Sequence, residues 1–421
     1  MNLRQAEDYL LGLELFGMRF GLDRMHKLMT VLGMPQRRFA SIHVVGTNGK
    51  SSTTRMTAAI LERHGLRTGI YTSPHLRGFP ERVEVAEQPL SEAAFAEAVA
   101  RAAHAAELVN RTLPEGDEVT QFEALTAAGF HALAAARVEV AVIEAGLGGR
   151  YDATNVIPSQ VQVLTSVGLD HTRWLGDTIA DIASEKLAVV RDHAALVIPP
   201  DLAPEAIPVA ERVAEEKHAR IVRAKRDLGL PMAARGSFQR HNYALAAATA
   251  EAFLGRSLDE HALAEAAAAV MVPGRMEVVG EDPLVILDGA HNGAGMAALA
   301  DALPEVVNAE GCAEGVTPSA RPLTVVISIL DDKDARVMLG ALLPLAENVV
   351  FTRSSNPRAL PPGTLAHLSE RPDAITVGNP TAALARAKEL AGSGGAVLAT
   401  GSIYLIADLV RQPGQARASM I

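Results

Sequence analysis

The sequence predicts an α/β protein of two domains, each built on a mostly parallel sheet with flanking helices. The chain has 421 residues, of which 48% are hydrophobic and 21% charged, and it is long for a single core. Short β-branched runs alternate with helical patterns along almost the whole chain. Pro273 and Gly274 interrupt this alternation, which then restarts, so we expect domains at residues 1–272 and 273–421.

The elements of the first domain are predicted from the spacing of apolar residues. Apolar residues at intervals of three and four favour helices, and continuous runs of valine and isoleucine favour buried parallel strands. A brief strand starts at Gly69 and ends in a turn at Pro74. The other predicted strands are residues 42–45, 138–143 and 161–167. The predicted helices are residues 3–16, 20–32, 50–64, 91–111, 120–136, 178–190, 204–218, 241–254 and 258–270.

The second domain repeats the alternation on a smaller scale. Helical stretches separate its strands, which predicts a doubly wound, Rossmann-like fold. The segment 305–322 contains two glycines and two prolines and is predicted as a loop excursion. The predicted strands are residues 284–287, 323–329, 348–351, 374–377 and 396–399.

Composition and charge exclude several classes of function. The net charge is −10, from 39 basic and 49 acidic residues, which argues against broad binding to nucleic acid or to an anionic membrane. The single cysteine, Cys312, excludes internal disulfides and a cysteine-based zinc site, and it fits a reducing compartment. The acidic residues Glu7, Asp8 and Glu14 argue against a signal peptide, and no uncharged apolar run reaches the length of about 18 residues that spans a membrane. We expect a cytoplasmic protein.

A phosphate-binding loop is the strongest motif in the chain. A β-branched strand runs into a glycine-punctuated turn, which opens a helix, at Gly46-Thr47-Asn48-Gly49-Lys50-Ser51-Ser52. The glycines allow the backbone to approach an anion, the lysine adds a positive charge, and either serine can offer a hydroxyl to Mg²⁺. The first glycine of the common pattern would fall on Val44, so the motif is a shorter variant. The first domain is therefore predicted to be of the P-loop type. The alternative is a glycine-rich turn with a surface lysine.

Polar residues follow three further strand ends of the first domain. Glu144 ends one predicted strand, His171 follows the next along the chain, and Ser73 follows the strand before. We expect the three strands to be adjacent, so that these side chains meet beside the loop as ligands of Mg²⁺. The alternatives are a surface carboxylate at Glu144 and a turn histidine capped by Asp170. A dinucleotide-binding motif is disfavoured, because Tyr151 stands at its third glycine position.

Together these motifs resemble the folylpolyglutamate synthase/dihydrofolate synthase family, which belongs to the Mur-type, ATP-dependent amide ligases. They occur in the order of the family and span almost the whole chain. The matching segments are Gly46–Lys50, Tyr71–Leu76, Glu144–Arg150, Asp152–Asn155, Gly168–His171, Leu175–Thr178, Ile182–Lys186, Pro273–Glu277, Leu287–Asn292 and Gly401–Tyr404.

The resemblance implies roles for individual residues. The catalytic set is Lys50, Glu144, His171 and Lys186. Two Mg²⁺ ions are implied, with the ligands Ser73, Glu144 and His171. Lys186 matches a lysine that is carbamylated near the second metal, and its alternative is an ordinary lysine on a helix surface. The implied ATP contacts are Asn48, Gly49, Lys50, Ser51, Ser52, Asn242, Arg275 and Asp288. The implied contacts with a pterin-bearing substrate are Thr120, Gln121, Phe122, Glu123, Tyr151, Asp152 and Ala153.

The implied activity is ATP-dependent ligation of L-glutamate to dihydropteroate, to reduced folate, or to both, through an acyl phosphate. The second domain would bring the glutamate and part of the nucleotide site, and we expect a monomer. The alternative for Arg275 and Asp288 is that they simply form an ion pair at the domain junction. The alternative for Phe122 is that it is an ordinary core residue of its helix. Two other functions remain open, a Mur-type cell-wall amino-acid ligase and a non-enzymatic nucleotide-binding switch. No general base for the incoming amine is evident.

Overall fold

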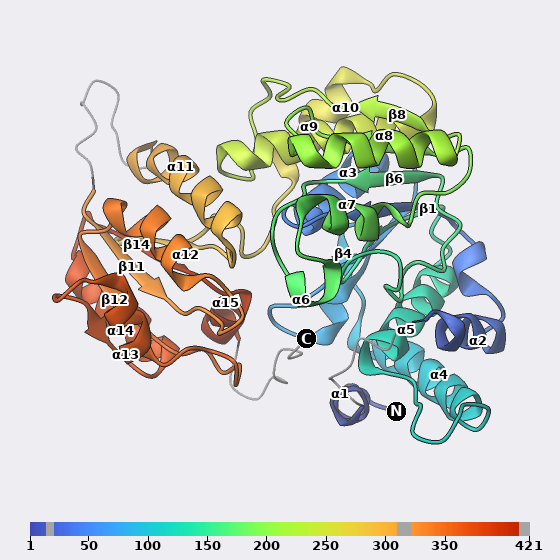
Figure 1. Ribbon diagram of the computed structural model, residues 1–421, viewed down its shortest axis with the longest axis horizontal. Helices are drawn as coiled ribbons and strands as arrows, with labels where there is room; N and C mark the ends of the chain where they lie inside the picture. Colours follow the sequence, from blue (N-terminus) through green and yellow to red (C-terminus); the bar gives the residue numbers. More distant parts are fainter. Residues whose placement is uncertain (14–20, 310–320, 412–421) are drawn as a thin grey trace. The chain divides into compact units, whose positions relative to one another are not determined.

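A computed structural model describes residues 1–13, 21–309 and 321–411, and these form two compact units (Figure 1). Among the described residues, one unit contains Met1–Pro231 and His241–Val270, and the other contains Met232–Arg240 and residues 271–411. Both units are α/β, as predicted. The predicted boundary between residues 272 and 273 stays a prediction.

The sheet of the first unit is mostly parallel, as predicted, with strand order β4-β3-β2-β5-β1-β6-β7-β8. The neighbouring pairs along β2-β5-β1-β6-β7-β8 are parallel, and the pairs β2–β3 and β3–β4 at one edge are antiparallel. The phosphate-loop strand β1 lies at the interior of the sheet, between β5 and β6. The strands are β1 Ala40–Val45, β2 Thr68–Tyr71, β3 Val83–Val85, β4 Gln88–Pro89, β5 Val140–Glu144, β6 Val161–Leu164, β7 Ala195–Ile198 and β8 Arg220–Arg223.

Helices cover both faces of this sheet. The helix after the phosphate loop, α3, packs on β1, β2 and β5 and against α10, whereas α4 and α5 contribute to an apolar core on the other face. None of the described helices is long and apolar enough to cross a membrane. The helices are α1 Leu3–Gly12, α2 Asp23–Val31, α3 Lys50–Arg63, α4 Glu92–Asn110, α5 Gln121–Ala135, α6 Thr172–Leu175, α7 Ile179–Leu187, α8 Ile207–Glu216, α9 Ser237–Leu254, which belongs to this unit from His241 onward, and α10 Glu260–Ala269.

The second unit contains a smaller sheet with strand order β13-β12-β11-β14-β10-β9. All of its pairs are parallel except β9 with β10, which form an antiparallel edge. The strands are β9 Glu277–Glu281, β10 Leu284–Leu287, β11 Leu323–Ile327, β12 Asn348–Phe351, β13 Ile375–Thr376 and β14 Ala396–Thr400. The helices are α11 Gly293–Ala309, α12 Ala335–Leu342, α13 Pro362–Ser369, α14 Pro380–Ala391 and α15 Ile403–Val410.

Sequence periodicity located most elements but missed β7, a fully buried interior strand of four residues, and the strands β3, β4, β8 and β9 at or near the sheet edges. The strands β3, β4, β8 and β9 are short or partly exposed, so they lack the continuous apolar run of a central strand. The loop excursion predicted for 305–322 is wrong for its first residues, because α11 continues through Pro304 to Ala309. Residues 14–16, 20 and 310–320, included in those predictions, lie outside the described part of the chain.

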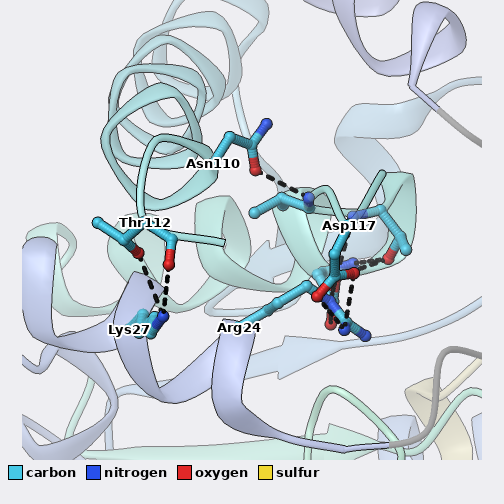
Figure 2. Close-up of polar contacts among 8 residues, drawn as sticks. Arg24, Lys27, Asn110, Thr112 and Asp117 are labelled. Atoms are coloured by element: carbon cyan, nitrogen blue, oxygen red, sulfur yellow. Dashed lines mark hydrogen bonds and ion pairs between the residues drawn. The ribbon is translucent and has the colours of Figure 1, made fainter. Parts of the chain in front are cut away.

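A buried ion-pair network fixes the connection between α4 and α5 (Figure 2). Arg24 of α2 donates from Nε to Glu123 Oε1 at 3.0 Å and from Nη1 to Asp117 Oδ1 at 3.2 Å. Arg24 and Glu123 are almost fully buried. Nearby, exposed Lys27 donates to Thr112 Oγ1 at 3.2 Å. The network therefore holds the first turn of α5 against α2.

We predict that Arg24→Leu destabilises the first unit far more than Lys27→Leu, although both residues lie on α2. Removal of Arg24 leaves the buried Glu123 carboxylate without its cationic partner, which costs about 3–5 kcal/mol. Loss of the exposed Lys27 contact costs about 1 kcal/mol or less. Thermal and urea unfolding of the two variants measures the difference. Equal losses would show that this network contributes little.

Candidate functional site

The phosphate loop connects β1 to α3 through two glycines with positive φ. Gly46 has φ 153° and Gly49 has φ 85°, a region that favours glycine. A Cβ atom on Gly46 would lie 1.9 Å from Thr165 Oγ1, and one on Gly49 would lie 2.6 Å from Asn242 Oδ1. Both positions therefore require glycine for conformation and for space. The second contact places the predicted ATP residue Asn242 directly against the loop.

Side chains at the end of β6 clamp this loop in place. Thr165 Oγ1 donates to the carbonyl oxygen of Asn48 at 2.6 Å, and Ser166 Oγ donates to the same oxygen at 3.0 Å. The Asn48 amide donates back to Ser166 Oγ at 2.9 Å. Thr47 adds a further link, because its hydroxyl donates to the Gly168 carbonyl and accepts from the Gly168 amide. The loop conformation is thus fixed by protein contacts alone, which favours preorganised anion binding.

Two lysine side chains converge on the carbonyl oxygen of Gly46. Lys50 Nζ donates to this oxygen at 3.1 Å, and Lys186 Nζ donates to it at 2.9 Å. Lys186 is 4% exposed, so its interpretation as a lysine on a helix surface is wrong. Burial, with a smaller repulsion from Lys50, lowers the pKa of Lys186 to about 7. A substantial fraction of the Lys186 amine is therefore neutral near physiological pH.

Glu144 connects the phosphate loop with the segment after β2. Its side chain is 1% exposed, so the interpretation as a surface carboxylate is wrong. Ser51 Oγ donates to Glu144 Oε1 at 2.9 Å, and the Ser73 amide donates to Oε2 at 3.2 Å. Carboxylate and hydroxyl oxygens are the ligands that Mg²⁺ prefers. The predicted ligands Glu144 and Ser73 are thus close together, with Ser51 of the loop beside them.

The strand that precedes His171 does not lie where the sequence predicts it. The strands that precede Ser73, Glu144 and His171 are β2, β5 and β6, and β1 lies between β5 and β6. The expectation of three adjacent strands is therefore wrong, because the crossovers of the chain insert the phosphate-loop strand between two of them. His171 begins α6 with a half-exposed imidazole, and its amide donates to Asp170 Oδ1 at 2.9 Å. That bond agrees with the alternative of a capped turn histidine.

Three of the four predicted substrate residues at the start of α5 already have partners within the protein. Thr120 and Glu123 form a capping box, in which each side chain accepts the backbone amide of the other. Glu123 also pairs with Arg24. Gln121 is fully buried and donates to a backbone carbonyl of α1 at 2.7 Å. These contacts position the fourth residue, Phe122, which is half-buried.

The segment 151–153 follows the glycine-rich turn after β5. Tyr151 is 42% exposed, whereas Asp152 and Ala153 are buried. Asp152 accepts hydrogen bonds from the Leu147 amide at 2.8 Å, from the Thr154 amide at 3.0 Å and from the Thr154 hydroxyl. Burial raises the pKa of Asp152, and these hydrogen bonds oppose the rise. Asp152 therefore holds the turn after β5 together.

Gly146 brings the two predicted substrate segments next to each other. A Cβ atom at Gly146 would lie 2.6 Å from Phe122 Cζ and 3.2 Å from Asp152 Oδ2. The Phe122 ring also lies 6.4 Å from the Tyr71 ring, measured between centroids. An aromatic face and a carboxylate thus border one glycine, an arrangement that suits a flat heterocycle with N–H groups at its edge.

Arg275 and Asp288 lie together in the second unit. Asp288 is 2% exposed and accepts the amides of Met276 at 2.9 Å and Ala290 at 2.7 Å. Burial raises the pKa of Asp288, and the positive charge of Arg275 opposes that rise. A Cβ atom on Gly289 would lie 2.3 Å from Arg275 Nη1, so the guanidinium packs on this glycine. Their predicted contact with ATP stays a prediction.

Several residues of the site were missed from the sequence. Thr47, Thr165 and Ser166 clamp the phosphate loop, and His43 bonds to Thr154 at 2.8 Å. A signal was present, because a polar residue within or just after an apolar strand must find a hydrogen-bond partner once buried. The sequence alone does not name that partner.

Two domain families match the chain. The Mur ligase middle domain matches residues 44–224, and the Mur ligase glutamate ligase domain matches residues 274–403. The chain is 36% identical over 391 residues to a dihydrofolate synthase/folylpolyglutamate synthase of Mycobacterium tuberculosis, covering 82% of this chain and 76% of the relative. It is 32% identical over 437 residues to the Bacillus subtilis protein of the same name, covering 96% and 98%.

Solved structures agree with these matches. Folylpolyglutamate synthase of M. tuberculosis, solved with ADP and AMPPCP, has a TM-score of 0.88 at 33% identity and covers 98% of this chain and 99% of its own. Escherichia coli FolC, solved with DHPP and ADP, has a TM-score of 0.83 at 28% identity and covers 97% and 96%. The chain therefore belongs to the dihydrofolate synthase/folylpolyglutamate synthase family of Mur-type ligases.

Proposed function

We propose that the protein is an ATP-dependent ligase that joins L-glutamate to dihydropteroate, to reduced folate, or to both. The observation that carries the proposal is the clamped phosphate loop, whose serine hydroxyl contacts the buried Glu144 carboxylate. A Mur-type fold supplies the context, and similar chains were solved with ADP and DHPP, and with Mn, AMPPNP and L-glutamate. No observation on this chain favours a muramyl substrate or a non-enzymatic switch.

The reaction needs activation of a carboxylate, because a carboxylate is a poor electrophile. Transfer of the γ-phosphoryl group of ATP to the acceptor carboxylate gives an acyl phosphate and ADP. The amine of glutamate then attacks the acyl carbon, and phosphate leaves. Phosphoryl transfer requires positioning and charge neutralisation more than covalent help from the protein. Lys50, at the start of α3, would supply positive charge, and the loop amides would supply hydrogen bonds.

Ser73, Glu144 and His171 would hold a divalent metal, with Ser51 next to them. The buried Glu144 carboxylate fits this role, because it is itself an oxygen ligand and the Ser51 hydroxyl lies beside it. Bound Mg²⁺ supplies additional neutralisation of the charge on the phosphate groups. We propose two such ions. Among the described residues, no group of three or more histidine, cysteine, aspartate or glutamate side chains gathers for a metal. We propose that hydroxyls and the nucleotide complete the coordination.

Lys186 is proposed to carry a carbamate near the second metal. A carbamate forms on a neutral amine, and burial beside Lys50 favours the neutral form. The product would place anionic oxygens beneath the phosphate loop, where the unmodified side chain now donates to Gly46. The second unit, with Arg275 and Asp288, would contribute to the nucleotide site and bring the glutamate, and the protein is proposed to act as a monomer in the cytoplasm.

We predict that ATP turnover requires both a pterin acceptor and glutamate. The acyl phosphate forms only on an acceptor carboxylate, and its phosphate leaves when the amine of glutamate attacks. A coupled phosphate-release assay with dihydropteroate, tetrahydrofolate and a muramyl substrate, each with and without glutamate, measures this dependence. Phosphate release and a ligated product in mass spectrometry are expected only with a pterin acceptor plus glutamate. Equal hydrolysis without glutamate, and no ligated product, would contradict the proposal.

Lys50→Ala and Glu144→Ala should each lower kcat by about 10²-fold or more. Lys50 supplies positive charge to the transferring phosphoryl group, whereas Glu144 is a proposed ligand of the metal that neutralises this group. Glu139→Ala is the matched control, since Glu139 is exposed just before β5, the strand that Glu144 ends. Steady-state kinetics at saturating Mg²⁺ compare the variants. A near wild-type kcat in either variant would remove that residue from the site.

Lys186→Ala should lose activity, and a short carboxylate such as acetate should restore part of it. The small anion can occupy the place of the carbamate, whereas it cannot replace a lysine that acts only by its ammonium group. Lys225→Ala, which changes an exposed lysine, should respond to acetate no differently from the wild type. Lost activity without any rescue would refute the carbamate, and full activity without acetate would remove Lys186 from the mechanism.

A further inference from the structure

His43 is a buried polar residue that the proposed reaction does not use. It lies in the interior strand β1, and the parallel register places it on the same face of the sheet as Tyr71 and Ile143. Its side chain is completely buried, and burial, aided by the charge of Arg191, lowers the pKa of His43 to about 3. The imidazole is therefore neutral, with one ring nitrogen as donor and the other as acceptor.

The hydrogen bonds around Thr154 decide which nitrogen carries the proton. The single hydroxyl hydrogen of Thr154 goes to Asp152 Oδ1, so Thr154 Oγ1 can only accept from His43 Nε2, 2.8 Å away. Among the described residues, His43 Nδ1 has no hydrogen-bond partner, which a bare lone pair tolerates better than an N–H group. The chain of bonds thus runs from His43 Nε2–H through Thr154 Oγ1–H to Asp152.

This direction has a consequence for Asp152. A protonated Asp152 could donate to Thr154, and the reversed chain would then place the proton of His43 on Nδ1, where no described partner accepts it. This chain of hydrogen bonds from His43 through Thr154 to Asp152, called the relay below, therefore favours an ionised Asp152. It also fixes the orientation of that carboxylate beside Gly146 and Phe122, next to the amide of Leu147.

We propose that His43 is a positioning residue for the acceptor, which acts through Thr154 to hold Asp152 as an oriented carboxylate for N–H groups of the pterin ring. The proposal rests on the proposed function, since it concerns the acceptor of that reaction. It assigns to the phosphate-loop strand a second role, because β1 leads to Gly46 at its end and carries His43 within it. The relay is on the opposite face of β1 from Ile42 and Val44, whose side chains alternate with that of His43.

The test is a set of paired substitutions at both members of the relay. His43→Leu removes the donor, and His43→Gln keeps an N–H group near the place of Nε2. Thr154→Val removes the hydroxyl with little change of shape, and Thr154→Ser retains it. The five proteins, including the wild type, are assayed with dihydropteroate, ATP, Mg²⁺ and glutamate, together with the double variant His43→Leu/Thr154→Val.

We expect His43→Leu and Thr154→Val each to raise KM for dihydropteroate about tenfold, as for loss of one hydrogen bond to a charged group. The kcat and KM for ATP should stay within about twofold, because the phosphate loop is not altered. His43→Gln and Thr154→Ser should recover most of the loss. The double variant should be no worse than either single variant, because both interrupt one relay.

An unchanged KM for dihydropteroate in either folded apolar variant, or additive losses in the double variant, would overturn the inference. A fall in kcat together with a higher KM for ATP, without rescue by His43→Gln, would overturn it in favour of a general structural role. If His43→Leu fails to fold, the comparison of Thr154→Val with Thr154→Ser decides. A wild-type protein that does not turn over pterin acceptors would overturn the proposed function itself, and this result is distinct from the others.

Discussion

The attachment of the phosphate loop to the end of β6 is the constraint on which the rest of the site depends. Asn48 is held from two neighbouring side chains, Thr165 and Ser166, and Gly46 fits only because it lacks a Cβ atom that would overlap Thr165. A loop fixed in this way presents its amides without reorganisation when an anion arrives, which is the main source of electrostatic catalysis in preorganised sites. The clamp also sets the position of Lys50, since α3 starts there.

Charge is distributed around that loop in an uneven way. Lys50 and Lys186 both donate to one carbonyl oxygen, and Lys186 has almost no access to water. Burial is the larger cause of the lowered pKa of Lys186, and repulsion between the two ammonium groups adds to it. Glu144 provides negative charge on the other side of the loop through Ser51. ATP and a divalent metal would therefore enter a site whose groups already have complementary charge.

The fold and the chemistry of the site were predictable to different degrees. The strands β1, β2, β5 and β6 and the glycine-rich turn were predictable, because β-branched runs and glycine spacing reflect local backbone preferences. The insertion of β1 between β5 and β6 was not, since strand order depends on crossovers between distant segments. The burial of Lys186 was also hidden, because a lysine near the end of an amphipathic helix is ordinarily solvated.

The substrate residues assigned by family resemblance fall into two groups, those that meet at one place in the fold and those that are engaged in structural contacts. Phe122 and Asp152 meet at Gly146, although they are 30 positions apart in sequence, with Phe122 in α5 and Asp152 in the turn after β5. Gln121 and Glu123, in contrast, are engaged in contacts that hold α5 against α1 and α2, which sequence reasoning could not separate from substrate binding. The His43 relay depends on a hydrogen bond across 111 positions of the chain, and no local pattern contains it.

The central claim is that the acceptor carboxylate is phosphorylated before glutamate attacks. Its most direct test is a turnover experiment with dihydropteroate labelled with oxygen-18 in its carboxylate, in the presence of ATP, Mg²⁺ and glutamate. Mass spectrometry of the released phosphate then follows the label. An acyl-phosphate route transfers one labelled oxygen to each phosphate released by ligation. Ligated product accompanied by phosphate without the label would contradict this account.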